Sequence, residues 1–535
     1  MAVATSAKKA GAHRRPKVAA TDRALGQRIR RGAMWSAAST LIMRFANISI
    51  MAVVARTLAP RDFGVFAVAM TVHAIVSSIA ELGVASCLVR ADVDLDELAP
   101  TVAAVSLISS TALAGGMYAF ARPLSSALGS SDAAGPMRVM AIAVLLVGVF
   151  AVPGANLARE FRQDKQFLAN IGGFIAANSL LLVLATHGGG ALSFAWSRVV
   201  GQFVIGTVMT MLVDRRYRPA LATKHLRFVL GFGLPLAGAN LLNFALLNTD
   251  YVFIGHLLGP VELGVYMLAF NISSWPSSLM STMLNSIAMP AFSRVKHDVA
   301  LLEAALVRAA TALAFVALPV CALTATLAHP LVRTIYGDRW NNAADVLAVL
   351  AVYGAISVLC LLFANALSGL GQTRLLLIAQ FPWIGCLVPA MAIGVHVNGI
   401  VGAAWAHIVV VCLVALPFYL YMLKRSAPIR ITAIARGVAP VLAAALLAAG
   451  TATLVAHALP GPALQLLGGG SAGSVVYLLF AVPIAQDVLG IGRLIPKRLA
   501  GPINGYVRQV QRFGVGVPAM GDNHSRERPS HRRSP

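Results

Sequence analysis

The sequence predicts an all-α polytopic membrane protein with about 14 transmembrane helices. Three observations predict this class: the composition, the spacing of apolar stretches and the distribution of basic residues. Of the 535 residues, 58% are hydrophobic and only 12% are charged, about half of the roughly 25% charged share of a soluble domain. Charged residues this few cannot cover the surface of a water-soluble globule of this length. We therefore expect the protein to lie in the lipid bilayer.

Apolar windows of about 20 residues mark the predicted spans, because that length of helix crosses the hydrocarbon core. The connections between them are short and rich in glycine, proline and charge. The predicted spans are 33–55, 63–84, 101–121, 137–157, 167–187, 190–212, 228–254, 263–289, 305–328, 343–368, 374–395, 399–423, 431–456 and 471–491.

The basic residues support this count and predict the orientation. If the N-terminus is cytoplasmic, fourteen spans return the C-terminus to the same side. Of the 43 Lys and Arg residues, 35 then lie on the inner side, six on the outer side and two within spans. Basic residues favour the cytoplasmic side, and a miscount by one span would scramble this bias. We therefore expect both termini to be cytoplasmic.

An internal repeat with an offset of 200 residues predicts two related halves. Residues 53–67 read VVARTLAPRDFGVFA and residues 253–267 read FIGHLLGPVELGVYM. In each copy, proline ends one helix, an acidic residue suits the start of the next, and glycine permits close packing. The corresponding pairs are Leu58/Leu258, Pro60/Pro260, Asp62/Glu262, Gly64/Gly264, Val65/Val265 and Phe66/Tyr266.

Six spans separate the two copies, so both have the same orientation in the membrane. Such a parallel repeat predicts two pseudo-symmetric six-helix lobes, plus two C-terminal helices, which is a transporter's layout. The predicted parts are a basic cytoplasmic tail at 1–32, an N-terminal lobe at 33–212, a cytoplasmic linker at 213–227, a C-terminal lobe at 228–423, two extra transmembrane helices at 424–491 and a second basic cytoplasmic tail at 492–535.

The two tails carry much of the net charge of +23, and their composition is typical of disordered segments. A basic tail beside a span meets anionic lipid headgroups or fixes topology. Nucleic acid is not an expected partner, because no basic motif interleaved with aromatic residues occurs.

Several segments resemble one bacterial family. ARTLAPRDFGVFAVA at 55–69 and ELGVASCLVR at 81–90 resemble the first helical hairpin of bacterial polysaccharide transporters. These are the lipid-linked oligosaccharide flippases of the multidrug/oligosaccharidyl-lipid/polysaccharide exporter superfamily. Later segments are also similar to this family, over a region that extends from about residue 30 to about residue 425: NTDYVFIGHLLGPVELGVYMLAF (248–270), PLVRTIYGDRWNNAADVLAVLA (330–351), NALSGLGQTR (365–374) and NGIVGAAWAH (398–407).

The resemblance implies a function and a location. It implies two lobes that alternate between inward-facing and outward-facing states in the bacterial cytoplasmic membrane, with spans one, two, seven and eight around a central cavity. The implied substrate is a polyprenyl-diphosphate-linked sugar, whose headgroup crosses through the cavity while its lipid tail stays in the bilayer. Polysaccharide-assembly proteins are candidate partners.

Ionisable residues within spans are candidates for function, because each costs about 2.5–3.5 kcal/mol on insertion. Arg44 lies near the centre of span one, and its planar fork suits the oxygens of a diphosphate; a structural ion pair is the alternative. Arg198 in span six is a second substrate-binding candidate, unless its side chain reaches the headgroups. Asp250 in span seven and Glu81 at the inner end of span two are candidates for a coupling proton or cation. Their alternatives are helix packing for Asp250 and a structural pair for Glu81.

Asparagines recur on the spans that would line the cavity. Their amides suit sugar hydroxyls, and hydrogen bonding between helices is the structural alternative. These substrate-binding candidates are Asn47, Asn240, Asn243, Asn248 and Asn271.

Other functional classes fit the sequence less well. The five cysteines are scattered without a C-x-x-C pair, so we expect no metal site, and no cofactor motif occurs. A polysaccharide polymerase or ligase is expected to carry a large outer loop, whereas the longest one here is about fifteen residues (122–136). A cation-coupled multidrug antiporter of the same superfamily predicts twelve spans and needs no phosphate-binding arginine. We therefore expect a transporter and not an enzyme.

Overall fold

The computed structural model describes residues 46–80, 95–160, 162–278 and 298–489, with isolated positions at 43, 88, 280, 281, 284 and 292. The described residues form helices and no strand, which confirms the predicted all-α class. The chain divides into two compact units, residues 1–57 and residues 58–535. In the first unit, residues 46–57 are helical; all that follows concerns the second.

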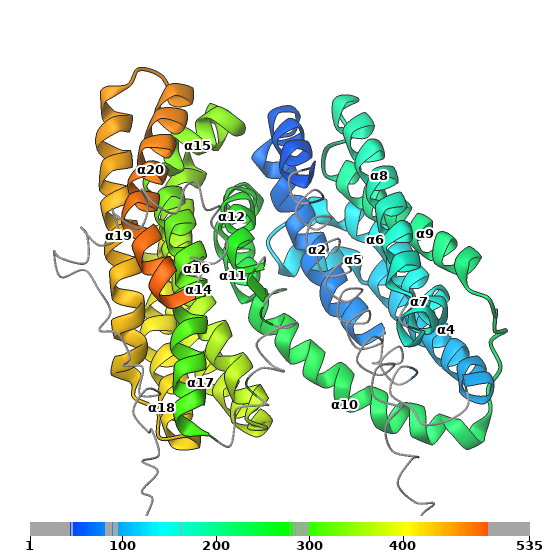
Figure 1. Ribbon diagram of the computed structural model, residues 1–535. Coiled ribbons are helices and arrows are strands. Elements are labelled where there is room, and N and C mark those ends of the chain that lie inside the picture. The colour runs from blue at the N-terminus through cyan, green and yellow to red at the C-terminus, as the bar shows by residue number, and fades with distance from the viewer. Residues whose placement is uncertain are drawn as a thin grey trace, which may run out of the picture. The chain divides into compact units, whose positions relative to one another are not determined.

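The first half of the second unit contains helices that match the predicted spans two to six (Figure 1). Its elements are α2 (Pro60–Ala80), α4 (Leu95–Ala119), α5 (Ala121–Ala127), η1 (Ser131–Ala133), α6 (Ala134–Val149), α7 (Ala151–Arg159), α8 (Gln163–Thr186) and α9 (Gly190–Leu212).

The second half contains helices that match the predicted spans seven to fourteen. Its elements are α10 (Thr223–Leu247), α11 (Thr249–Leu258), α12 (Pro260–Ser273), α14 (Val299–Thr326), α15 (Ala328–Ile335), η2 (Asp338–Trp340), α16 (Asn342–Gly369), α17 (Thr373–Val410), η3 (Val411–Ala415), α18 (Leu416–Ser426), α19 (Ile431–Ala458) and α20 (Pro462–Leu489). Within α17, Asn398 and Gly399 are non-helical, at the predicted turn between spans eleven and twelve.

Within the described ranges, ten helices are long and apolar enough to cross a membrane. The predicted number of 14 is consistent with this arrangement and stays a prediction. The numbers ten and 14 differ for two reasons. Arg374–Ser426 counts as one continuous segment where two spans are predicted, and the described helices of spans one, seven and eight are not among the ten.

Span seven is broken, although the sequence predicts one continuous helix over 228–254. Asn248 has φ −122° and ψ 11° and separates α10 from α11. Helix α11 then continues to Leu258, where Gly259 and Pro260 end it. Asp250 therefore lies eight residues before the end of the helix, or about 12 Å at 1.5 Å per residue, which is well inside a hydrocarbon core about 30 Å thick.

The two segments of span seven differ in what they pack against: α10 lies against the first half, whereas α11 contacts both halves. Val229 and Ala237 of α10 belong to an apolar cluster with Val102 of α4 and Val152 of α7, whereas α11 contacts α12 and α17. Figure 1 follows α10 from beside α4 and α2 toward α11. The predicted lobe boundaries, including the linker at 213–227, stay predictions.

The two copies of the repeat contact each other through α2 and α12. A Cβ atom added to Gly64 would overlap the carbonyl oxygen of Pro260, and one added to Gly264 would overlap the carbonyl oxygen of Pro60. Gly64 thus contacts Pro260, and Gly264 makes the equivalent contact with Pro60. Such a reciprocal pair of contacts is typical of an isologous two-fold interface. The predicted pseudo-symmetry of the two halves is therefore present in the contact between α2 and α12.

Short helices lie beside this contact, where the sequence predicts only loops. The ring of Trp340 in η2 packs edge-on against Phe63 of α2, with 4.7 Å between ring centroids. The imidazole Nδ1 of His256 in α11 lies 2.9 Å from the carbonyl oxygen of Ala127 in α5. Elements of each half therefore contact the other half at the end of the helices that is predicted to lie outside.

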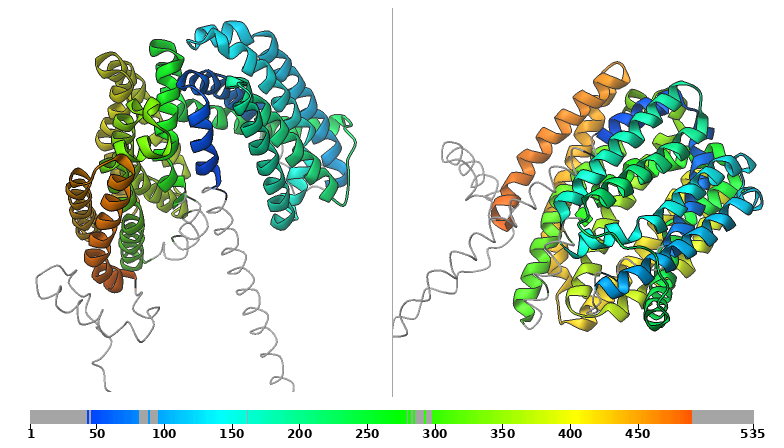
Figure 2. Two further views of the ribbon diagram at one scale, coloured as in Figure 1. Left: turned by 90° about the horizontal axis from the view of Figure 1, so that it is seen from above. Right: turned by 90° about the vertical axis from the view of Figure 1, so that its right-hand side faces the viewer.

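Helices α19 and α20 form a hairpin beside α14 (Figure 2). The Tyr477 hydroxyl donates to the Phe315 carbonyl over 2.6 Å. Helix α20 begins at Pro462, nine residues before the predicted start of span fourteen. The glycine-rich stretch is helical because small residues let the two backbones approach: a Cβ on Gly473 would lie 2.8 Å from the Ala448 carbonyl oxygen.

Candidate functional site

A buried acid–imidazole pair lies where α11 meets α17. The Oδ2 atom of Asp250 is 3.6 Å from Nε2 of His407, and the two side chains are 2% and 9% exposed. The other carboxylate oxygen, Oδ1, accepts a hydrogen bond from the Tyr251 backbone N–H over 2.9 Å. Among the ion pairs between described residues, this is the one in which both partners are buried.

Three polar atoms of this site find no hydrogen-bond partner among the described residues. They are Oδ2 of Asp250, Nε2 of His407 and the hydroxyl of Tyr266. The Tyr266 hydroxyl lies near the Asp250 carboxyl without completing a hydrogen bond of ordinary geometry. Buried polar atoms in native proteins are nearly always paired, so these three define a place for a proton, a water molecule or a small cation.

Aromatic rings enclose the pair. The Tyr353 ring of α16 lies 4.9 Å from the His407 ring, and the Phe270 ring of α12 lies 6.3 Å from it. In such apolar surroundings a lone charge is costly.

His407 was not selected from the sequence, although it lies within the family-like segment 398–407. A second alignment of the two halves, at an offset of 209, identifies it. AWSRVV at 195–200 corresponds to AWAHIV at 404–409, so that His407 stands where the first half has Arg198. The structure supports this offset. Gly190 and Gly399 each lie five residues before these segments, and both have φ +53°, a conformation that favours glycine.

Arg198 lies on α9 and is exposed. Its guanidinium is within electrostatic range of the buried His73 imidazole and forms no ion pair with any other described residue. An exposed arginine within a predicted span is available to an anion, but the structure does not bring it into contact with Asp250.

Two of the predicted asparagines form hydrogen bonds to backbone carbonyls one turn before them. Asn248 and Asn271 use their side-chain N–H groups within their own helices, donating to the carbonyls of Phe244 (2.8 Å) and Met267 (2.9 Å). Asn240 is half-buried on α10, and Asn243 lies on the same helix.

Two of the three remaining candidates, Arg44 and Asn47, belong to the first unit, and Glu81 belongs to the second. Asn47 is exposed on the helical segment 46–57. Arg44 and Glu81 lie outside the described residues. Their predicted roles, like those of the asparagines, stay predictions. No group of three or more His, Cys, Asp or Glu side chains that could hold a metal occurs in the part of the chain that the structure describes.

Two related halves of apolar helices, joined through a reciprocal contact and holding a buried acid–imidazole pair, define a multi-pass membrane protein of transporter architecture. The chain belongs to the polysaccharide biosynthesis protein family, whose model matches residues 53–345.

Relatives and solved structures agree with this assignment. The chain is 26% identical over 477 residues to the succinoglycan biosynthesis transport protein ExoT of Rhizobium meliloti, covering 86% of this chain and 94% of that one. It is 20% identical to the lipopolysaccharide biosynthesis protein WzxC of Escherichia coli, covering 74% and 80% of the two chains.

Two solved structures share the fold. Lipid II flippase MurJ in an inward closed conformation has a TM-score of 0.70 at 13% identity, over 84% of this chain and 98% of that one. An inward-facing multidrug resistance MATE family transporter has a TM-score of 0.58 at 18% identity, over 72% and 94% of the two chains.

Proposed function

We propose that this protein moves a lipid-linked oligosaccharide, a precursor of a bacterial polysaccharide, across the cytoplasmic membrane by alternating access. The observation that carries the proposal is the relationship to a succinoglycan biosynthesis transport protein over nearly the full length of both chains. A similarity of that extent includes residues of both halves and is not confined to one shared helix pair.

The contact between α2 and α12 supports alternating access. Pro60, Gly64, Pro260 and Gly264 hold the two halves together at the end predicted to be outer, and Phe63 with Trp340 adds an apolar contact there. Separating these residues would open the protein to the outside. The contact is built from small residues and short turns, which can part without unfolding either half.

The Asp250–His407 pair is the proposed coupling site. Uptake of one proton by the carboxylate–neutral imidazole state removes a net negative charge from an apolar region, and a small cation at Oδ2 would have the same electrostatic effect. Asp250 lies just after the break at Asn248, and His407 lies in the part of α17 that follows the break at Asn398–Gly399. A change of charge therefore acts on two helix segments that can reorient.

The proposed substrate is a polyprenyl-diphosphate-linked sugar, with Arg44 and Arg198 as the candidate contacts for its diphosphate and the asparagines for its hydroxyls. Arginine's planar set of donors matches phosphate oxygens. On this proposal the chain performs no covalent chemistry, both termini are cytoplasmic, and enzymes of polysaccharide assembly act before and after it.

Deleting the gene tests the substrate class. A lipid-linked oligosaccharide should accumulate on the cytoplasmic face of the membrane, and the intact gene should restore export. If no lipid-linked sugar accumulates and only drug sensitivity changes, the function is that of a multidrug antiporter, to which the MATE-like fold also corresponds.

Replacing Arg44 tests the diphosphate contact. Arg44→Ala should abolish export in the deletion strain at an unchanged protein level. Arg122→Ala, which removes an exposed arginine of α5, is the matched control and should export normally. Full export by Arg44→Ala would exclude the proposed contact.

A further inference from the structure

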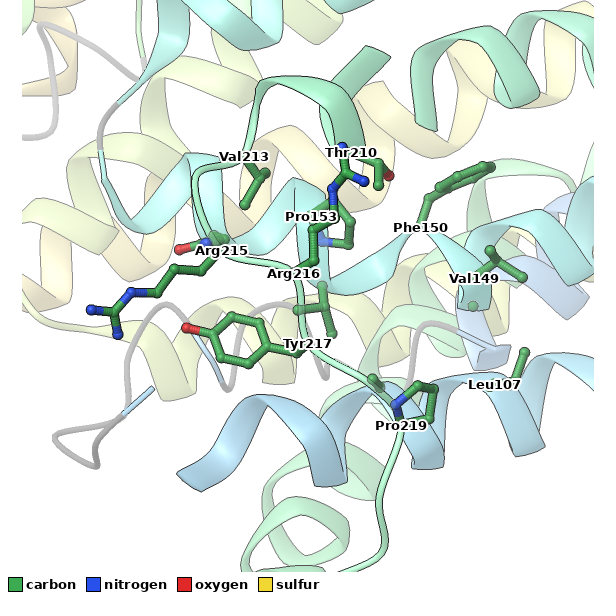
Figure 3. Close-up of a pocket in the computed structure, with 14 residues that line it drawn as sticks. Leu107, Val149, Phe150, Pro153, Thr210, Val213, Arg215, Arg216, Tyr217 and Pro219 are labelled. Carbon is green, nitrogen blue, oxygen red and sulfur yellow. The ribbon is translucent and has the colours of Figure 1, made fainter. Parts of the chain in front are cut away.

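A cavity lies in the first half of the protein and is lined by neither Asp250 nor His407. It has a volume of about 280 Å³ and lies between α4, the junction of α6 with α7, the end of α9 and the segment after α9 (Figure 3). The residues around it are Ala103, Leu107, Gly148, Val149, Phe150, Val152, Pro153, Asn156, Thr210, Val213, Arg215, Arg216, Tyr217 and Pro219.

The cavity is apolar on the membrane side and cationic on the other. Leu107, Val149 and Phe150 form the apolar part, and Val149 is 47% exposed, so the wall continues into the surface that faces lipid. Arg215 and Arg216 follow the last residues of α9, at the end of the helices that the charge bias predicts to be cytoplasmic. The wall thus changes from apolar to basic toward the end of the helices that is predicted to be cytoplasmic.

The two arginines differ in what they contact. Arg215 pairs with Asp96, with 2.5 Å between Nη1 and Oδ2, and the pKa of the Arg215 guanidinium is raised by its hydrogen bond to that carboxylate. Arg216 forms no ion pair with any described residue. In Figure 3, the Arg216 side chain extends toward Thr210, whereas Arg215 points the other way. The cavity therefore presents one cation that no described acid neutralises.

A buried hydrogen-bond acceptor lies in the same wall. Asn156 is 2% exposed, and its Oδ1 atom has no partner among the described residues. Asn156 lies one turn closer to the end of α7 than Pro153, on the polar side of the cavity. A buried amide oxygen without a donor is unfavourable, so this position fits a ligand that brings a hydroxyl group.

We propose that this cavity binds an anionic phospholipid of the inner leaflet whose headgroup carries a hydroxyl, as phosphatidylglycerol does. The phosphate pairs with Arg216, a headgroup hydroxyl donates to Asn156 Oδ1, and an acyl chain lies along Leu107 and Val149. Basic pockets between helices on the cytoplasmic side are suited to such lipids. The site holds a membrane lipid and is independent of the transported substrate.

Native mass spectrometry of the full-length protein in detergent tests this proposal, with phosphatidylglycerol, phosphatidic acid and phosphatidylethanolamine added in turn. The unmodified protein should retain phosphatidylglycerol in preference to the other two. Arg216→Ala should weaken phosphatidylglycerol binding about fivefold, the factor expected for one basic residue at an anionic headgroup. Arg218→Ala removes the same charge from the same segment without lining the cavity and should change binding less than about twofold.

Two further variants separate the apolar and hydroxyl contacts. Val149→Trp fills the cavity from its exposed side and should reduce retention of every lipid without changing the charge. Asn156→Leu should lower the affinity for phosphatidylglycerol and leave that for phosphatidic acid, which lacks the hydroxyl, unchanged. Equal losses in Arg216→Ala and Arg218→Ala, undiminished binding in Val149→Trp, or displacement of the lipid by inorganic phosphate alone would each overturn the proposal.

Discussion

The Asp250 carboxylate and the His407 imidazole lie 3.6 Å apart within an apolar part of the second half, and neither side chain is appreciably exposed. The two residues are 157 positions apart in the sequence, so the packing of α11 against α17 brings them together. A buried ion pair adds little net stability, because desolvation offsets the attraction. The coupling role proposed for the pair is therefore tested by removing its charge.

The first prediction concerns this pair. Asp250→Asn keeps the shape of the side chain and removes its charge, so the protein should fold but lose transport driven by a pH gradient. The measurement is uptake of a lipid-linked oligosaccharide into proteoliposomes with and without an imposed gradient. Asp132→Asn, which changes an exposed acid of η1, is the control and should respond to the gradient normally. Gradient-driven uptake by Asp250→Asn would rule out the coupling role.

The second prediction concerns the contact between the halves. In Gly64→Ala, the added methyl group meets the backbone of Pro260, and backbone atoms cannot move aside as a side chain can. Overpacking of this kind costs about 1–3 kcal/mol, which favours the separated state by roughly 5- to 150-fold. Amide hydrogen exchange around residues 60–66 and 260–266 should therefore become faster, and export should fall.

The control for this prediction is Gly115→Ala. Nothing lies within 4 Å of a Cβ atom at Gly115, so alanine there should leave both exchange and export unchanged. If the two variants behave alike, helix propensity rather than the contact explains the result.

The third prediction concerns the attachment of the C-terminal hairpin. Glu303 of α14 is buried and accepts hydrogen bonds from the backbone N–H of Arg430 (2.9 Å) and from its Nη2 (2.9 Å). Glu303→Gln leaves one of these donors without an acceptor and should lower the thermal unfolding midpoint by a few degrees. Asp96→Asn breaks a pair that is exposed on both sides, where ion pairs contribute little, and the midpoint should not change. An equal shift in both variants would contradict the anchoring role of Glu303.

The fourth prediction concerns Arg198. Because the side chain is exposed, Arg198→Ala should fold normally. If its guanidinium binds the diphosphate, its loss removes charge-assisted hydrogen bonds of about 1.5–3 kcal/mol and should raise the half-saturating substrate concentration by roughly ten- to a hundredfold. Arg198→Lys keeps the charge without the fork and should lie between the two. Unchanged kinetics in Arg198→Ala would exclude a substrate contact.

Much of the fold could be predicted because membrane helices must satisfy their own backbone. Apolar length therefore marks most spans, and proline and glycine mark their ends, as at Pro60 and Gly399. The start of α20 was missed because a run of glycines usually ends a helix. At Gly469 and Gly473 the run instead permits the close approach of α19, and tertiary packing overrides the local preference of the backbone.

The candidate site was only partly predictable. Asp250 is conspicuous because an acid within an apolar run is costly. His407 is less conspicuous because a histidine can be neutral. A single histidine within an apolar run therefore does not by itself indicate a functional site. The offset of 209 that pairs it with Arg198 differs from the offset of 200 at Pro60 and Pro260, so one ungapped comparison of the halves could not reveal both.

The reciprocal contact at Gly64 and Gly264 has a consequence for how the two halves diverged. A surface that packs against its own counterpart must fit itself, so a bulky substitution in one copy collides with the other and cannot be accommodated by change in that copy alone. Arg198 and His407 are equivalent positions that do not pack against each other, so they can differ in chemistry. Similarity between the two halves is therefore expected at the contact of α2 with α12, and differences in chemistry are expected away from it.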